Sequence, residues 1–159
     1  MKIILAGIEY VGTTTLDFER SSIGTPIGLR QAVERNLTWL REHGEELPKT
    51  TYEAVRFEWA ERFIEVQTAT MLAYRIISMQ DAGEIPNAES SIAKLFTTEL
   101  TQRISRTSSQ MVGMGGDITD EKAPLKGMPV QGYGNQVRET IAGGTSEIQR
   151  NIVAVGYQW

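Results

Sequence analysis

The sequence has no cysteine among its 159 residues and only one histidine, His43. The missing cysteines exclude disulfides, thiolate metal ligands and a cysteine nucleophile, and a single histidine excludes metal sites built on several. His43 stands at an apparent helix end, where we expect it to face water. A formal net charge of -4 also argues against nucleic acid as the main partner, because phosphate binding needs a basic surface. We therefore expect neither a metal nor nucleic acid as a partner.

Long apolar runs are missing as well. The run at residues 1–8 is too short to cross a bilayer, and Glu9 ends it without a clear signal-peptide cleavage pattern. What is present, 40% apolar and 23% charged residues, is typical of a soluble globular domain with its own core. We expect a single domain over residues 1–159, no membrane span and a cytoplasmic location.

Apolar residues recur at steps of three and four over a first long stretch, which predicts an amphipathic helix from about Leu16 to Gly44. Pro26 lies inside the stretch and predicts a kink or a break near residues 24–25. Residues 1–12 before it are expected to form an arm, with a short strand possible at residues 3–5. The expected inner stripe of this helix includes Leu29, Val33, Leu37 and Leu40.

Two further stretches have the same periodicity. The second helix is expected to end at Gly83, and the third to open at residues 86–87 and reach about Val112. The acidic residues between Glu53 and Glu65 are expected to form a solvated face. The expected core of the second helix is Tyr52, Val55, Trp59, Phe63, Val66, Ala73 and Ile77. That of the third is Ile92, Leu95, Phe96, Leu100 and Ile104.

The remaining segments complete the predicted fold. Residues 113–135 are rich in glycine and proline and are expected to form a long ordered loop. Thr145 is a good N-cap for a last helix, whose first turn carries Glu147 with Arg150 one turn later. Short turns between long helices predict an all-α, antiparallel up-down four-helix bundle.

Four strings carry a resemblance to a known family. They are Thr-Thr-Leu-Asp-Phe-Glu-Arg at 14–20, the middle-helix runs Ala-Tyr-Arg at 73–75 with Ala-Lys-Leu-Phe at 93–96, Gln-Met-Val-Gly-Met-Gly-Gly at 110–116 and, most specific, Gly-Gly-Thr-Ser-Glu-Ile-Gln-Arg at 143–150. The chain resembles the C-terminal helical domain of acyl-CoA dehydrogenases from about residue 13 to 154. This resemblance implies FAD as cofactor, an acyl-CoA substrate and α,β-dehydrogenation of the thioester.

The resemblance also implies where the base lies. Many members place the catalytic carboxylate two residues before the signature threonine, where this sequence has Gly143. Members similar to isovaleryl-CoA and long-chain dehydrogenases supply it from the first helix in a Glu-Arg pair, which is Glu19-Arg20 here. The resemblance therefore implies Glu19 as base, the Gly143 backbone N–H as donor to the thioester carbonyl, and Arg20 as a residue that holds the site or the acyl-CoA. Without it, the pair would be interpreted as a solvated pair at a helix start.

The flavin-binding wall is implied at Gln110, Gly113, Thr145 and Glu147. On local grounds Gln110 could simply cap its helix, and Thr145 is an N-cap in either case. The family's N-terminal helical and middle β-domains have no counterpart in these residues, and its Arg-x-x-Phe-Gly segment is replaced by residues 45–50. We therefore expect a homo- or hetero-oligomer with chains that supply the missing domains. The alternatives are a noncatalytic partner of full-length subunits, or an inactive fragment.

Overall fold

The computed structural model describes residues 24–113 and 123–157, and these parts contain helices but no strand. The helices are α2 (Gly24–His43), α3 (Lys49–Asp81), α4 (Asn87–Val112), α5 (Met128–Glu139) and α6 (Ser146–Gly156), with 3-10 turns η1 (Gly44–Glu46) and η3 (Pro124–Gly127). The predicted ends near Gly44, Gly83 and Val112 are confirmed. The predicted arm and strand, the pair Glu19-Arg20 and the start of the first helix lie outside the described residues, so the break expected near residues 24–25 stays a prediction.

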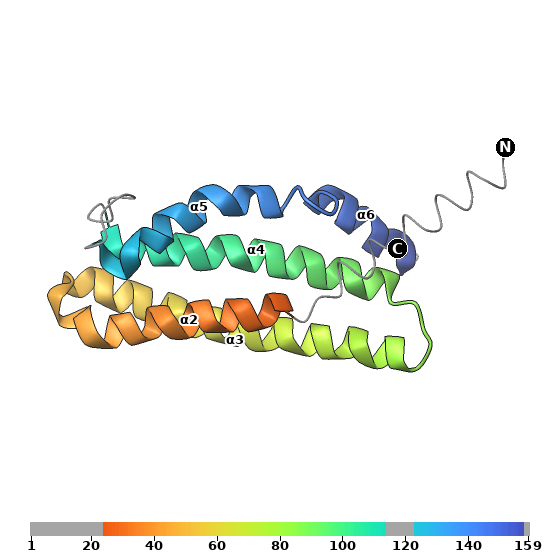
Figure 1. Ribbon diagram of the computed structural model, residues 1–159, viewed down its shortest axis with the longest axis horizontal. Helices are drawn as coiled ribbons and strands as arrows, with labels where there is room; N and C mark the ends of the chain where they lie inside the picture. The colour runs from red at the N-terminus through yellow and green to blue at the C-terminus, as the bar shows by residue number, and fades with distance from the viewer. Residues whose placement is uncertain (1–23, 114–122, 158–159) are drawn as a thin grey trace.

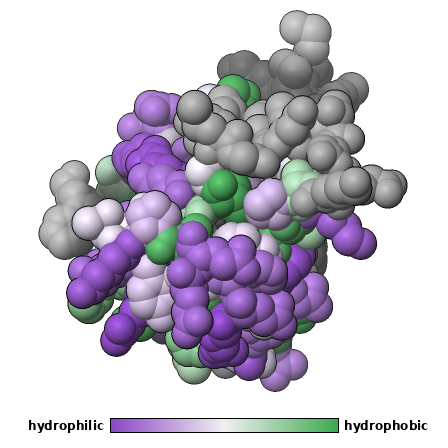
Figure 2. All heavy atoms as spheres, turned by 90° about the vertical axis from the view of Figure 1, so that its left-hand side faces the viewer, coloured by the Kyte–Doolittle hydropathy of each residue, from purple (hydrophilic) through white to green (hydrophobic). Residues whose placement is uncertain are grey.

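The helices form an antiparallel up-down bundle, as expected. Helices α2, α3 and α4 alternate in direction, and α5 and α6 follow one another along α4 in the fourth position (Figure 1). At the end where α2 turns into α3, hydrophilic residues cover most of the described surface and apolar residues show between them (Figure 2). The difference from the prediction is that the fourth rod consists of two helices, and the signature turn joins them partway along the bundle.

Helix α4 is the centre of the bundle, because α2, α3, α5 and α6 all pack on it. Its buried residues are mostly small and polar: Ser90, Ser91, Thr97, Thr98, Ser105, Thr107 and Ser108. Several threonines satisfy their hydroxyls locally, since Thr97 Oγ1 donates to the Ala93 carbonyl at 2.7 Å and Thr98 Oγ1 to the Lys94 carbonyl at 2.9 Å. Small side chains let four neighbours approach one helix. The predicted stripe is correct at Leu100 and Ile104, but Ile92, Leu95 and Phe96 are only half-buried.

Helix α3 buries a narrower stripe than predicted. Trp59, Val66 and Ala73 follow one another at seven-residue steps and define the line of contact with the core. Phe63 and Ile77, which were expected in the core, are 41% and 39% exposed. They lie four residues beyond Trp59 and Ala73, a step of about 400° that turns them past the line of contact. The other buried residues of this stripe are Val55, Ala69 and Ile76.

The acidic face of α3 is only partly solvated. Glu58 accepts a hydrogen bond from Thr107 Oγ1 at 2.8 Å, and Glu65 pairs with Arg103 at 2.9 Å, so both reach α4. Arg62, with 11% of its side chain exposed, pairs with Glu65 between the helices. The prediction of a solvated face was therefore wrong for these residues. They form a polar contact between α3 and α4 instead.

The segment expected as a loop over residues 113–135 is helical in its second half. Helix α5 starts at Met128 with Gly127 in the left-handed region before it and Pro129 in its first turn, which is a favourable helix start. Its glycines lower its helix propensity and led the sequence-based interpretation to a loop. Packing against α4 outweighs that propensity, and Gly132 allows the approach: a Cβ there would lie 3.3 Å from Ser105 Oγ.

Candidate functional site

The turn between α5 and α6 contains the signature residues. Gly143 and Gly144 have φ of 66° and 97°, a region that favours glycine, so the sequence-based interpretation of a helix break is confirmed. Thr145 is the N-cap of α6, and its side chain accepts a hydrogen bond from the Ile148 N–H at 3.4 Å. Gly143 is exposed and Thr145 half-buried. The turn therefore presents backbone at the bundle surface, at the N-terminal end of a helix.

Two buried side chains hold the carbonyls of this turn. Gln149 is fully buried, and its Nε2 donates to the Gly143 carbonyl at 2.9 Å. Lys94, 9% exposed on α4, donates from Nζ to the Gly144 carbonyl at 2.5 Å. Neither residue was expected to have a role from the sequence, although both belong to the strings that carry the family resemblance. A lysine among apolar neighbours was the available signal, because a buried ammonium needs a specific partner.

The crowding at Gly144 gives a stability prediction. A Cβ at this position would lie 2.6 Å from Gln149 Nε2 and would stand on a backbone with φ of 97°. Gly144→Ala should therefore lower the free energy of unfolding by about 1–3 kcal/mol, measured by urea denaturation. The matched control is Gly28→Ala on α2, where nothing lies within 4 Å, and a gain of about 0.4–1 kcal/mol is expected. Equal effects of both substitutions on the free energy of unfolding would contradict the conclusion that position 144 requires glycine.

Glu147 and Arg150 place opposite charges on the first turns of α6. The pKa of the Glu147 carboxyl is lowered by its own backbone N–H, by the Thr145 side chain and by Arg150. Arg150 itself pairs with Glu99 of α4 at 2.6 Å. This pair lies at the edge of an open groove of about 430 Å³ between α4 and α6. The groove is lined by Ile92, Leu95, Phe96, Glu99, Arg150, Val153 and Ala154.

The other two predicted flavin contacts lie elsewhere on the bundle. Gln110 is exposed near the end of α4 and lines a shallow pocket with residues of α3, while Gly113 caps the same helix with φ of 62°. Sixteen residues of α4 separate Gln110 from Lys94, the residue that holds the turn, which corresponds to about 24 Å of helix. The structure thus brings Gly143, Thr145 and Glu147 together, and it keeps Gln110 and Gly113 apart from them.

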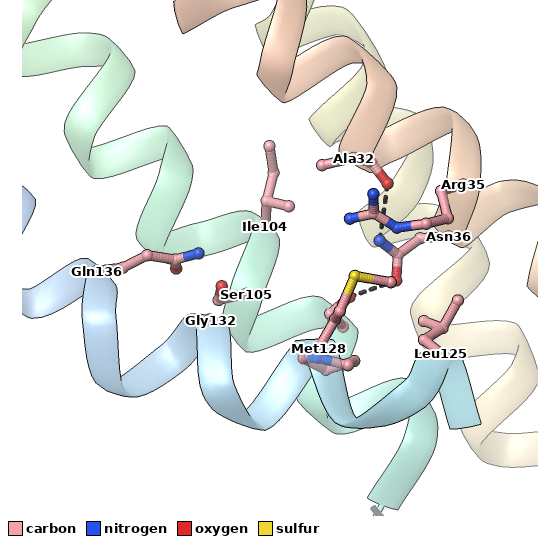
Figure 3. Close-up of a pocket in the computed structure, with 11 residues that line it drawn as sticks. Ala32, Arg35, Asn36, Ile104, Ser105, Leu125, Met128, Gly132 and Gln136 are labelled. Atoms are coloured by element: carbon pink, nitrogen blue, oxygen red, sulfur yellow. Dashed lines mark hydrogen bonds between the residues drawn. The ribbon is translucent and has the colours of Figure 1, made fainter. Parts of the chain in front are cut away.

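A cavity of about 320 Å³ with a mixed polar and apolar lining lies between α2, α4 and α5 (Figure 3). Asn36 enters it from α2, donating to the Ala32 carbonyl at 2.8 Å and accepting from Ser108 of α4. Ser105, Gly132 and Gln136 line the opposite side. This mixture of polar and apolar residues suits water better than an acyl chain. Nothing in the hydropathy pattern indicated the cavity, because its polar lining comes from three helices that meet only in the folded bundle.

His43 is half-buried at the end of α2 rather than simply facing water. Its ring stacks on Trp39 with centroids 4.8 Å apart, and Nδ1 lies 3.1 Å from the Trp39 carbonyl. The carbonyl can only accept, so Nδ1 carries the proton in this contact. In residues 24–113 and 123–157, no group of three or more histidine or acidic side chains is arranged to hold a metal ion. None of the helices there has an apolar stretch long enough to cross a membrane.

These observations define a class of protein: an all-α bundle with a glycine turn and a capped helix on its fourth rod. The family described as "Acyl-CoA dehydrogenase, C-terminal domain" matches residues 6–157. The chain therefore belongs to the acyl-CoA dehydrogenase family and corresponds to its C-terminal helical domain. This confirms both the resemblance and the fold expected from the sequence.

The individual relatives agree with this assignment. The chain is 30% identical to the mitochondrial short-chain specific acyl-CoA dehydrogenase of Rattus norvegicus, covering 91% of this chain and 34% of that protein. It is 30% identical to benzylmalonyl-CoA dehydrogenase of Aromatoleum aromaticum, covering 97% and 37%. The chain thus spans about a third of the length of these relatives.

Among solved structures, the "Tcur3481-Tcur3483 steroid ACAD G363A variant" superposes with a TM-score of 0.76 at 27% identity. The alignment covers 92% of this chain and 39% of that one. The structure of "PigA with FAD and proline" has a TM-score of 0.73 at 19% identity, covering 90% and 37%, and at that identity it shows the fold alone.

Proposed function

We propose that this chain is the C-terminal domain of an FAD-dependent acyl-CoA dehydrogenase and acts on an acyl-CoA thioester together with domains from outside these 159 residues. The observation that supports the proposal is the turn at residues 143–145. It is exposed, begins a helix, and has its carbonyls held from within the bundle. The signature string of the acyl-CoA dehydrogenase family lies at this turn, so family membership supports a role for the turn in binding the flavin and the acyl thioester.

In the proposed reaction, Glu19 removes the proton from the α-carbon of the thioester. The Gly143 N–H donates to the thioester oxygen as negative charge develops on it, a role that needs no side chain. Arg20 holds the acyl-CoA or the geometry of the site. Bound FAD would supply the acceptor for the β-hydride. Glu19 needs an apolar, water-poor surrounding to act as a base near neutral pH, because burial raises a carboxyl pKa.

The fit of FAD to this chain is partial. Thr145 and Glu147 lie at the N-terminal end of α6, which favours negatively charged or polarised ligand groups. The pKa of the Glu147 carboxyl is lowered, so this side chain is an acceptor and not a donor there. Gln110 lies about 24 Å along α4 from Lys94, and Gly113 follows three residues later, so both would hold a different part of the cofactor or a second cofactor. A complete site therefore needs surfaces beyond these residues.

The test is to purify the chain, add FAD and follow protein mass and flavin absorbance together on a sizing column, alone and after mixing with a protein that supplies the missing domains. The mixed sample is then assayed for acyl-CoA-dependent bleaching of the flavin. Flavin that co-elutes and is bleached supports the proposal. A folded mixture that forms a complex but stays colourless overturns it.

A second function, an association domain for other dehydrogenase subunits, is favoured by the outer face of α3. Phe57, Ile64 and Met71 are 71%, 65% and 66% exposed and follow one another at seven-residue steps. Ala60 and Tyr74 lie between and beyond them at steps of three, and both are exposed. The result is an apolar stripe of about 25 Å along the helix, with the spacing of a helix-packing seam. Such a stripe suits another helical bundle.

The stripe predicts a change in oligomeric state. The double variant Ile64→Glu and Met71→Glu should elute at a lower mass than the parent, because two carboxylates would be desolvated in the contact. Helix content should stay the same, since both side chains are exposed. The matched control is Ile27→Glu on α2, an apolar residue 52% exposed away from the stripe, which should leave the mass unchanged. A parent that elutes as a monomer would contradict the association role.

A further inference from the structure

Lys94 is an unusual residue for the interior of a helical bundle. Only 9% of it is exposed, and it lies on α4, the helix on which all the others pack. Burying an ammonium is costly unless strong acceptors replace water. Its Nζ donates to the Gly144 carbonyl at 2.5 Å, a charge-assisted contact across fifty residues of sequence. The side chain therefore joins the central helix to the signature turn.

The turn needs such a contact because its own residues do little to fix it. Gly143 and Gly144 have no side chains and both have positive φ, so no side chain of their own can anchor the backbone here. Gln149 fixes the first carbonyl from within α6, and Lys94 fixes the second from α4. Gln149 belongs to the helix that the turn precedes. Lys94 is therefore the contact that ties the Gly144 carbonyl itself to α4, while the contacts of Gln102 with Thr140 and of Arg150 with Glu99 join α4 to the chain before and after the turn.

Fixing a carbonyl also fixes the amide on the other side of the peptide. The peptide bond is planar and trans, so the Thr145 N–H points opposite to the Gly144 carbonyl and away from Lys94. A cation that donates to the carbonyl polarises the peptide and strengthens the N–H as a donor. The Lys94 Cε also lies 4.0 Å from the place of a Cβ at Gly143, so the ammonium chain lies directly beneath the turn.

We propose that Lys94 is a positioning residue, which holds the turn at residues 143–145 so that its backbone donors face the acyl thioester and the cofactor. The proposal rests on the function proposed above for the direction in which the donors act. The other part of the proposal, that Lys94 orders the turn, depends only on the contact between Lys94 and the Gly144 carbonyl. The two parts can therefore be tested separately.

The first test uses the chain by itself and needs no ligand. Lys94→Met should raise amide hydrogen exchange by about tenfold or more within residues 141–147, because the charged hydrogen bond is lost. Exchange within α3 should not change. Lys94→Arg, which keeps a cationic donor, should restore part of the protection. The matched control is Lys126→Met, since Lys126 is exposed. Unchanged exchange at residues 141–147 in a folded Lys94→Met variant would overturn the proposal.

If Lys94→Met does not fold, Lys94→Gln replaces it in this experiment. The glutamine side chain is polar, but it carries no charge and is too short to reach the Gly144 carbonyl as lysine does.

The second test uses the flavin-loaded assembly. A positioning role predicts that kcat falls by about tenfold or more while KM changes little, with partial recovery in Lys94→Arg. A merely structural role would lower stability without this split, and that result would overturn the positioning role. An inactive parent assembly would count against the proposed function, and the exchange experiment would still decide the role of Lys94.

Discussion

Replacing Trp59 with alanine is expected to lower the free energy of unfolding by about 3–5 kcal/mol, the largest stability effect of any single substitution considered for this chain. Trp59 has no exposed surface and belongs to the core cluster formed by α2, α3 and α4. Its removal leaves a large cavity at the place where three helices meet, and the long, straight helices around it cannot close the gap. Urea denaturation followed by circular dichroism measures the loss.

Phe57 provides the matched control on the same helix. It is also aromatic and lies only two residues earlier, but it is 71% exposed. Phe57→Ala should change the free energy of unfolding by about 0.5 kcal/mol or less, as is usual at the surface. A third variant, Trp59→Phe, keeps an aromatic ring in the core and should therefore cost less than Trp59→Ala. The Trp59 indole N–H is buried without a partner among the described residues, so this smaller substitution removes an unsatisfied donor together with part of the ring.

The largest expected effect on activity is at Glu19. In an assembly that carries the missing domains, Glu19→Gln should lower the rate of α-proton removal by about 10²–10⁴-fold, because an amide cannot accept the proton. Binding of acyl-CoA should change far less, since size and shape are kept. Rapid-mixing measurement of flavin bleaching separates the two. The prediction rests on the resemblance of the Glu-Arg pair, because Glu19 lies outside the described residues.

Glu42→Gln is the control for this experiment, because it makes the same chemical change at an exposed position of α2. It should leave the rate unchanged. A full rate in Glu19→Gln would move the base elsewhere. The chain has no acid at position 143, so the search would then turn to carboxylates that the missing domains bring to the turn.

The parts of the fold that the sequence predicted correctly are those with strong local causes. Glycine at 83, proline at 86 and the threonine cap at 145 determine helix ends through backbone geometry, and the structure confirms each of them. The missed parts depend on what packs against a helix. Phe63 was expected inside because it is apolar, whereas Ser90 and Ser91 are fully buried because four helices crowd around α4. Hydropathy along one helix contains no information on how many neighbours that helix has.

The site divides in the same way. The glycine turn and its cap could be located from the sequence because they need particular residue types. The roles of Lys94 and Gln149 could not. The Lys94 contact with Gly144 spans fifty residues and forms only when α4 and the turn come together, and the Gln149 contact with Gly143 depends on how the turn folds back on the start of α6. The distance between Gln110 and the turn was also hidden. Gln110 and the turn both belong to strings that carry the family resemblance, but the strings do not show where along α4 the turn packs.

The two-piece construction of the fourth rod has a consequence for the order in which the molecule comes apart. Helices α3 and α4 are joined by a short link at residues 82–86 and are braced by α2, whereas α5 and α6 pack chiefly on α4. Detaching the C-terminal pair would break contacts with α4 and leave the contacts among the other three helices in place. The signature turn belongs to that pair. A ligand seated on the turn would add its binding free energy to a part of the chain that packs almost entirely on one helix, so ligand binding and the docking of α5 and α6 on α4 would be coupled.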